Sequence, residues 1–213
     1  MNVLDDVKDA VVSGNVEKTL AGINTAIAAG IVPGEIIRMG LITAMEVVGD
    51  RFKNGEIYVP EMLIAARAMK AGLNILKPLM VGTENKSLAT VVIGTVKGDL
   101  HDIGKNLVSI MMEGAGCKVI DLGVDIAPEA FVEAVGVHHP DFLAMSALLT
   151  TTMPMMKQTI AALEKSGKRG GVQVLVGGAP IGQKFADEIG ADGYAGNAAE
   201  AVDKIKVIIQ RAN

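Results

Sequence analysis

The sequence predicts two successive parts, a bundle of helices followed by a five-stranded parallel α/β domain. Up to Met80 the apolar residues recur at helical spacing. After Ser87, short apolar runs alternate with helical segments, which is typical of a parallel sheet with helices on both faces. We therefore expect residues 1–86 to form the helical part with its linker, and residues 87–213 to form the α/β domain.

Four helices with short connections predict an antiparallel bundle. Asn15 is placed to cap the second helix, and Pro33 and Pro60 suit the first turns of the third and fourth. The polar stretch Val81–Ser87 is the expected boundary between the two parts. The four helices are expected at Val3–Val12, Val16–Ala29, Glu35–Phe52 and Glu61–Leu79, and the third buries a face formed by Ile36, Ile37, Leu41, Met45 and Val48.

Composition excludes several classes of function. The 213 residues are 50% hydrophobic, with a net charge of −4 and no Lys- or Arg-rich run, so we expect no nucleic-acid partner. No apolar run approaches the roughly 18 residues of a membrane span, and the acidic stretch Met1–Asp6 is unlike a signal peptide. We expect a cytoplasmic protein in which the single cysteine, Cys117, and most of the 12 methionines fill the core.

The second part is expected to form a doubly wound sheet of the flavodoxin-like or Rossmann-like type. The commonest small version has strand order 2-1-3-4-5, and its ligand crevice lies where strands 1 and 3 part. Strands are expected at Ala89–Val96, Lys118–Leu122, Phe142–Ser146, Val172–Val176 and Gly193–Ala195. Helices are expected at Ile103–Glu113, Glu129–Val137, Met153–Lys165, Gly182–Ile189 and Ala199–Gln210.

The stretch Gly98–Gly104 joins the first of these strands to the helix after it. A histidine there, His101, is able to present one ring nitrogen to a metal, while a carboxylate two residues earlier, Asp99, takes the proton of the other. Gly104 leaves room for a large group close to the backbone. The competing interpretation is a helix start capped by Asp99 beside a surface histidine. His138 and His139, next to a proline, are expected at the surface.

Asp99, His101 and Gly104 form an Asp-x-His-x-x-Gly run, which resembles the signature of cobalamin-binding domains. The wider stretch Gly94–Asn106 is most similar to the methyl-transferring branch, which includes methionine synthase and the corrinoid proteins of methanol and methylamine metabolism. The resemblance implies that cobalamin binds with its benzimidazole released (base-off) and with His101 as the metal ligand in its place (His-on). The cofactor-binding stretch would comprise Gly98, Asp99, His101, Asp102, Ile103 and Gly104.

The hydroxyl-rich loop after the third strand resembles the family's second signature, Ser-x-Leu, as Ser146 and Leu148. In the family this loop lines the channel for the nucleotide tail of the cofactor, and Thr150 matches a position that hydrogen-bonds the tail. Thr152 matches a position that reaches the aspartate, so the resemblance implies a catalytic relay of Thr152, Asp99 and His101. An equally simple interpretation is that Thr150, Thr151 or Thr152 caps the helix that begins near Pro154.

Further family positions fall in both parts of the chain. Gly177 and Gly178 match the Gly-Gly after the fourth strand, and Ala198 matches the last contact to the tail. In the helical part, Phe52 and Val59 match positions that shield the upper face of the corrin. The resemblance therefore implies that the helical part is a cap over the cofactor, and apolar cover of this kind would exclude water.

The resemblance implies a methyl carrier rather than a complete enzyme. Cobalamin would alternate between methylcobalamin and cob(I)alamin, loaded by a substrate-specific methyltransferase and unloaded by a second methyltransferase with a thiol or folate-type acceptor. A homodimer is compatible with the helical part. Two other functions stay open, a cobalamin-dependent regulator or photoreceptor and a subunit of an adenosylcobalamin isomerase, as does a cobalamin-free α/β module.

Overall fold

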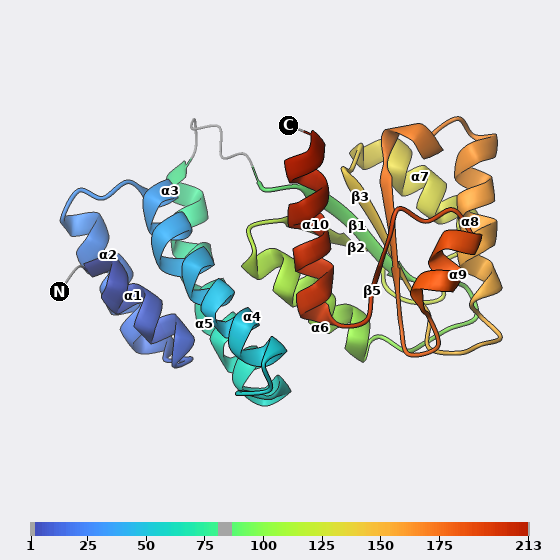
Figure 1. The fold of residues 1–213 in the computed structure, drawn as a ribbon. Coiled ribbons are helices and arrows are strands. Elements are labelled where there is room, and N and C mark those ends of the chain that lie inside the picture. Colours follow the sequence, from blue (N-terminus) through green and yellow to red (C-terminus); the bar gives the residue numbers. More distant parts are fainter. Residues whose placement is uncertain (1–2, 81–86, 213) are drawn as a thin grey trace. The chain divides into compact units, whose positions relative to one another are not determined.

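A computed structural model describes residues 3–80 and 87–212. The chain divides into two compact units, a helical unit (Met1–Lys86 with Gly114–Gly116) and an α/β unit (Ser87–Glu113 with Cys117–Asn213) (Figure 1). Of the predicted linker, only Ser87 falls among the described residues.

The helical unit consists of consecutive helices joined by short turns. Asn15 caps α2 as predicted, because its side chain accepts a hydrogen bond of 2.9 Å from the Lys18 amide. Val7, Ile23 and Met62, from three different helices, are fully buried in its core. The elements are α1 (Val3–Val12), α2 (Val16–Ala28), α3 (Pro33–Glu35), η1 (Ile36–Ile42), α4 (Thr43–Lys53), α5 (Val59–Leu76) and η2 (Lys77–Met80).

The predicted third helix is continuous, but its first half is wound differently from an α-helix. Elements α3, η1 and α4 follow one another without a break, and η1 is a π-helix in which the Thr43 amide bonds to the Arg38 carbonyl. The predicted apolar face is confirmed, since its five residues are all buried. The predicted fourth helix begins earlier, at Val59, and ends in a 3₁₀ turn at Pro78, where proline lacks the amide that an α-helix needs.

The α/β unit contains a five-stranded, all-parallel sheet in the order β2-β1-β3-β4-β5, as predicted. The strands are β1 (Thr90–Thr95), β2 (Lys118–Asp121), β3 (Phe142–Ser146), β4 (Gln173–Gly177) and β5 (Gly193–Ala195). The helices are α6 (Ile103–Gly114), α7 (Pro128–His138), α8 (Pro154–Lys165), the 3₁₀ turn η3 (Arg169–Gly171), α9 (Gln183–Glu188) and α10 (Ala198–Ala212). In the register of β1 and β3, Thr95 lies opposite Ser146, so the loops that follow these strands begin side by side.

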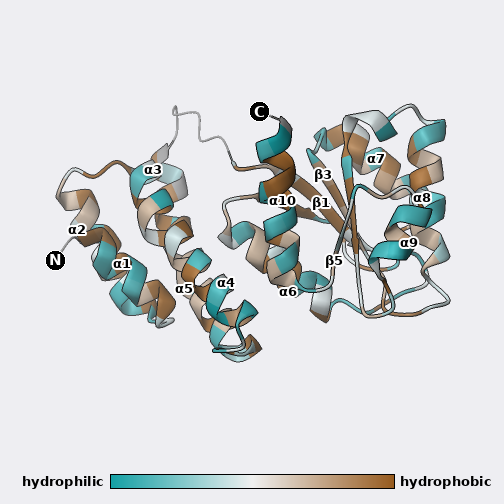
Figure 2. Ribbon diagram, in the orientation of Figure 1, coloured by the Kyte–Doolittle hydropathy of each residue, from teal (hydrophilic) through white to brown (hydrophobic). Residues whose placement is uncertain are grey.

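Both faces of the sheet are covered, and its strands are apolar along most of their length (Figure 2). Helices α6 and α10 lie on one face, and α7, α8 and α9 lie on the other (Figure 1). Val92, Leu143 and Val174 belong to the core beneath α7–α9. Side chains alternate along a strand, so the buried neighbours Val91 and Phe142 point to the opposite face. Burial on both sides explains why these strands are continuous apolar runs.

Candidate functional site

The turn after β1 places Asp99 and His101 at the carboxyl end of the sheet. The turn is closed by bonds from the Asp99 amide to the Val96 carbonyl (3.1 Å) and from the Thr95 hydroxyl to the His101 carbonyl (3.0 Å). Gly98 has a φ of +82°, a left-handed conformation that glycine adopts readily. Residues 99–101 therefore fold back over the end of β1, where it parts from β2 and β3.

Asp99 is a fully buried carboxylate that accepts hydrogen bonds from two loops. Its Oδ1 atom accepts from the His101 amide (3.1 Å) and faces the His101 Nδ1 atom at 2.7 Å. Its Oδ2 atom accepts from the amides of Leu148 (2.7 Å) and Leu149 (3.2 Å) and from the Thr152 hydroxyl (2.8 Å). One carboxylate thus joins the loop after β1 to the loop after β3.

These hydrogen bonds decide the charge of Asp99. Burial by itself raises the pKa of the carboxyl, but the bonds from the His101 ring, the Leu148 and His101 amides and the Thr152 hydroxyl outweigh burial and hold the pKa well below its ordinary value. Asp99 is therefore ionised at neutral pH. It does not cap helix α6, so the interpretation of Asp99 as a helix cap is wrong.

His101 is oriented by this carboxylate while its ring stays accessible. The His101 side chain is 51% exposed, whereas that of Asp99 is 0% exposed. An ionised carboxylate 2.7 Å from Nδ1 requires that Nδ1 carry the proton. The Nε2 atom has no hydrogen-bond partner among the described residues. A carboxylate–histidine pair of this form is the usual arrangement of a metal-ligating imidazole.

The two loops beside the imidazole carry several large, exposed apolar side chains and leave open space at Gly104. Leu100, Ile103, Leu148 and Leu149 are exposed by 71%, 83%, 42% and 40%. A Cβ atom built on Gly104 meets no atom within 4 Å. Large exposed apolar side chains from two loops beside an oriented imidazole are suited to the face of a broad, flat ligand.

Thr152 is the threonine of the β3–α8 loop that reaches the site. Its Oγ1 atom lies 2.8 Å from Asp99 Oδ2 and 2.9 Å from the Leu149 carbonyl. The residue before helix α8 is Met153, whose side chain makes no capping bond, so Thr152 is not the helix cap. Thr150 is exposed and Ser146 half-buried at the end of β3, and neither side chain has a hydrogen bond among the described residues.

Gly177 and Gly178 are required by the packing of the protein backbone itself. A Cβ atom on Gly177 would lie 2.9 Å from the Ala195 carbonyl oxygen, and one on Gly178, whose φ is +132°, would overlap the carbonyl of Ala147. The neighbouring backbone therefore excludes a side chain at both positions, whether or not a ligand lies against them. Ala198 is buried at the first position of α10.

Sequence reasoning missed an ion pair beside the site, in which a buried lysine meets an exposed aspartate. Lys105, in the first turn of α6, is 3% exposed, pairs with Asp121 and donates to the Asn106 side chain at 2.7 Å. Asn106 in turn donates to Asp102 at 3.0 Å. The position of Asp121 at the carboxyl end of β2 was the one signal in the sequence for this network.

The cysteine and the other two histidines take no part in the hydrogen bonds around Asp99 and His101. Burial raises the pKa of Cys117 to about 11, so its thiol is protonated at neutral pH and the residue acts as core filler, as expected. His138 and His139 are exposed, also as expected. Among residues 3–80 and 87–212, no group of three or more His, Cys, Asp or Glu side chains is arranged to hold a metal ion. Within the same residues, no helix is long and apolar enough to cross a membrane.

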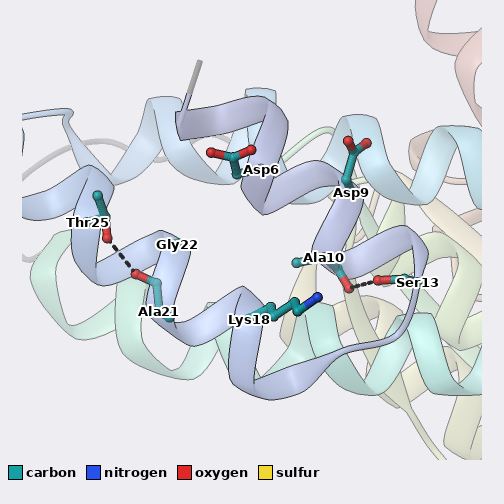
Figure 3. Close-up of a pocket in the computed structure, with 8 residues that line it drawn as sticks. All are labelled: Asp6, Asp9, Ala10, Ser13, Lys18, Ala21, Gly22 and Thr25. Atoms are coloured by element: carbon teal, nitrogen blue, oxygen red, sulfur yellow. Dashed lines mark hydrogen bonds between the residues drawn. The ribbon is translucent and has the colours of Figure 1, made fainter. Parts of the chain in front are cut away.

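A pocket of about 430 Å³ lies between α1 and α2 in the helical unit (Figure 3). The Ser13 and Thr25 hydroxyls donate to carbonyls of their own helical segments, at 3.1 and 3.0 Å. Its charged groups, Asp6, Asp9 and Lys18, lie on exposed helix surface. None of the predicted site residues lines this pocket.

The sheet order and the single oriented imidazole define a class of B12-binding protein. Residues 89–205 match a family model described as a B12 binding domain, and residues 3–77 match a second model with the same description. The chain therefore belongs to the B12-binding corrinoid proteins, and its cofactor is cobalamin, as the sequence predicted.

Named relatives narrow this class. The chain is 44% identical over 210 residues to trimethylamine corrinoid protein 2 of Methanosarcina acetivorans, covering 98% of this chain and 97% of that protein. It is 44% identical over 208 residues to dimethylamine corrinoid protein 2 of the same organism, covering 97% and 96%. Among solved structures, the methanol:cobalamin methyltransferase complex MtaBC from Methanosarcina barkeri matches with a TM-score of 0.89 at 32% identity, covering 98% of this chain and 80% of that chain.

The residues of the site fit this cofactor. The cobalt of a corrin is held by ring nitrogens, so a protein that ligates it would add a single donor, as for haem iron. His101 provides an exposed imidazole that Asp99 orients through Nδ1, with the Nε2 side of the ring directed away from that carboxylate. Leu100, Ile103 and Leu148 provide apolar surface around it, and Gly104 provides space.

Proposed function

We propose that this chain is a methyl carrier that binds cobalamin base-off, with His101 as the lower axial ligand. The observation that carries the proposal is the buried, ionised Asp99, 2.7 Å from Nδ1 of a half-exposed imidazole. Cobalamin, when bound, supplies a cobalt centre that accepts and gives up a methyl group. The protein's part is to provide the axial nitrogen and to control the proton on the other side of the ring.

Asp99 and Thr152 act on the proton at Nδ1. The ionised carboxylate keeps this proton on Nδ1 and increases the basicity of Nε2, which strengthens a metal–nitrogen bond. The Thr152 hydroxyl has one proton and two acceptors within reach, Asp99 Oδ2 and the Leu149 carbonyl. When the Thr152 hydroxyl turns from Asp99 to the Leu149 carbonyl, it no longer partly neutralises the carboxylate. The negative charge that the His101 ring faces then increases. These three residues form the proposed relay.

The loops after β3 and β4 and the start of α10 are the proposed site of the nucleotide tail. Ser146 and Thr150 offer hydroxyl groups, and Leu148 offers an exposed apolar side chain. Gly177 and Gly178 keep the end of β4 close to its neighbours, and Ala198 adds a small residue. These assignments derive from the family resemblance, and the sheet order supports them by placing the β1 and β3 loops together.

The helical unit is the proposed cap, with residues 1–86 as one domain and residues 87–213 as the cofactor-binding domain. Phe52, near the end of α4, and Val59, at the start of α5, flank one short connection. Both side chains are partly exposed, and the exposed fraction of Val59 is 37%. They are thus available to cover an apolar ligand face.

A methylated amine is the proposed methyl source. The relatives that are 44% identical are named for trimethylamine and dimethylamine, whereas the methanol complex shares 32% identity. In this proposal one methyltransferase loads the chain and a second transfers the methyl group to a thiol or folate-type acceptor. The same names favour a carrier over a regulator, a photoreceptor or an isomerase subunit.

Electron paramagnetic resonance of the cob(II)alamin-loaded protein tests the axial ligand. We would label the protein with [¹⁵N]histidine and keep cobalamin at natural abundance. If His101 coordinates cobalt, each cobalt line of the unlabelled protein is split into three by the ¹⁴N nucleus of the ligand. In the labelled protein each line should be split into two, by ¹⁵N. His101→Ala should lose the splitting, and His138→Ala, a change at an exposed histidine, should keep it. A three-line pattern in the labelled protein would mean that benzimidazole is still bound, and the proposal would fail.

Methyl transfer is tested separately. The loaded protein is first reduced chemically to the cob(I)alamin state. Mixing it then with a trimethylamine, dimethylamine or methanol methyltransferase and its substrate should give methylcobalamin with one of the amines. Methylation from methanol alone would refute the proposed amine source. Methylation from none of the three would refute the carrier role.

A further inference from the structure

Asp125 holds the backbone of the turn that carries Asp99. It lies in the loop between β2 and α7, and its Oδ1 atom accepts a hydrogen bond of 2.7 Å from the Gly98 amide. Its own amide donates to the Asp99 carbonyl oxygen at 3.0 Å. Asp125 therefore binds two consecutive residues, Gly98 through its side chain and Asp99 through its backbone amide.

The backbone of Asp125 is in a conformation that few residues adopt. Its φ is +57°, and in the part of the chain that the structure describes the only other non-glycine residue with positive φ is His139, at +44°. His139 is the C-cap of helix α7, where a left-handed residue is common. Asp125 ends no helix, and such a conformation persists only where surrounding contacts enforce it.

The loop that carries Asp125 is itself fixed to the sheet and to helix α6. Asp121 accepts from the Gly123 amide at 2.9 Å and pairs with the buried Lys105. The Thr95 amide donates to the Gly123 carbonyl, and the Ile126 amide donates to the Thr95 carbonyl, both at 3.0 Å. The loop is therefore a firm support for the contacts that Asp125 makes.

We propose that Asp125 is a positioning residue, which fixes the Gly98–Asp99 backbone and through it the orientation of Asp99 and the His101 ring. Gly98 has a φ of +82° and, as a glycine, loses more conformational freedom than any other residue when the turn forms. A charge-assisted bond from its amide to Asp125 restricts that freedom. The part of this proposal that concerns cobalt ligation rests on the function proposed above.

Three substitutions separate the contributions of residue 125. Asp125→Asn keeps an oxygen acceptor and a residue type that tolerates left-handed backbone. Asp125→Gly keeps the backbone conformation and removes the acceptor. His139→Gly makes the corresponding change at the other left-handed position and controls for a glycine effect on general stability.

The first measurement uses the cofactor-free protein, so it does not depend on cobalamin binding. NMR would follow amide hydrogen exchange at Gly98 and the ¹⁵N shifts of the His101 ring, which report the tautomer. In Asp125→Gly, exchange at Gly98 should be at least roughly tenfold faster, since a bond to a charged acceptor is lost. The His101 ring should change from one dominant tautomer to a mixture. Asp125→Asn should restore slow exchange and a single tautomer, and His139→Gly should change neither.

The second measurement is the histidine-ligated fraction of the cob(II)alamin-loaded variants by electron paramagnetic resonance. The proposal expects a lower fraction in Asp125→Gly and a fraction near that of the unmodified chain in Asp125→Asn. A single tautomer and an unchanged fraction in Asp125→Gly would overturn the positioning role. If the unmodified protein shows no histidine ligation, the proposed function fails, but the NMR comparison still decides the role of Asp125.

Discussion

Replacing Gly104 with leucine should weaken cobalamin binding without destabilising the cofactor-free protein. Gly104 is the second residue of α6, three positions after His101. A Cβ atom built there meets no atom within 4 Å, so the apo structure has room for a side chain. If the proposed site is correct, this room is occupied by the cofactor.

A side chain at position 104 should have opposite effects on the stability of the apo protein and on its affinity for cobalamin. Glycine inside a helix is less stable than alanine by about 0.5–1 kcal/mol, so Gly104→Ala should leave the melting temperature unchanged or slightly raised. Side-chain atoms forced into a filled contact cost about 1–3 kcal/mol. At 1.4 kcal/mol per factor of ten, Gly104→Leu should raise the dissociation constant for cobalamin by roughly 5-fold to 140-fold.

Calorimetric titration with hydroxocobalamin gives the affinity, and thermal circular dichroism of the apo protein gives the stability. The sequence has no tryptophan, so circular dichroism is the more practical probe. Gly170→Leu is the matched control, since a Cβ atom at Gly170 also meets no atom within 4 Å and this residue lies in η3, before the amino end of β4. The control should bind cobalamin normally.

Equal affinity in Gly104→Leu and the unmodified chain would show that the space beside α6 is not filled by the cofactor. That result would refute the placement of cobalamin over this turn. A variant that loses affinity and also melts at a lower temperature would contradict the reasoning from the apo structure, because the side chain would then be clashing with the protein itself.

Three further outcomes follow from the buried groups. Thr152→Val removes a donor to a buried carboxylate, so the pKa of Asp99 should rise toward its ordinary value and urea denaturation at pH 7 should show a loss of about 2 kcal/mol. This loss should shrink only as the pH falls through the pKa of Asp99 in the folded variant, where protonation ends the advantage of the charged form, and an unchanged pKa of Asp99 in the variant, followed by NMR, would contradict it. Cys117, with its raised pKa of about 11, should resist iodoacetamide at pH 8 in the native protein and react once urea unfolds the chain, as mass spectrometry would show. Gly178→Ala should destabilise the chain by several kcal/mol, because its Cβ atom overlaps a backbone carbonyl, whereas Gly182→Ala, with no atom within 4 Å, should melt normally.

The fold was predictable from the sequence because its signals are local. Runs such as Ala89–Val96 and Phe142–Ser146 are apolar over a strand's length, since both faces of the sheet are covered. The strand order followed from the most common arrangement for five βα units and is confirmed. The π-helical winding of Ile36–Ile42 was not predicted, since an apolar pattern fixes which face is buried but not the hydrogen-bond spacing.

Only those parts of the candidate site that depend on side-chain type and on close spacing in the sequence were predictable. Asp99 and His101 lie two residues apart, so their pairing was visible in one short motif. The Leu148 and Leu149 amides that bind Asp99 are 49 and 50 residues away along the chain, and a backbone amide leaves no mark in the residue type. Asp125 was missed for a similar reason, because its role depends on a left-handed backbone that its sequence neighbours do not indicate.

Asp99 is where these separate observations meet. Its Oδ1 atom faces His101, its Oδ2 atom binds the loop after β3, and its carbonyl oxygen binds Asp125 in the loop after β2. The loops after three neighbouring strands therefore converge on one residue, which follows β1, the strand that lies between β2 and β3. A movement of the β3 loop, where we place the nucleotide tail, would act on Asp99 and hence on the Nδ1 proton of His101. If the proposed function is correct, the tail and the axial ligand would influence each other through this single buried carboxylate.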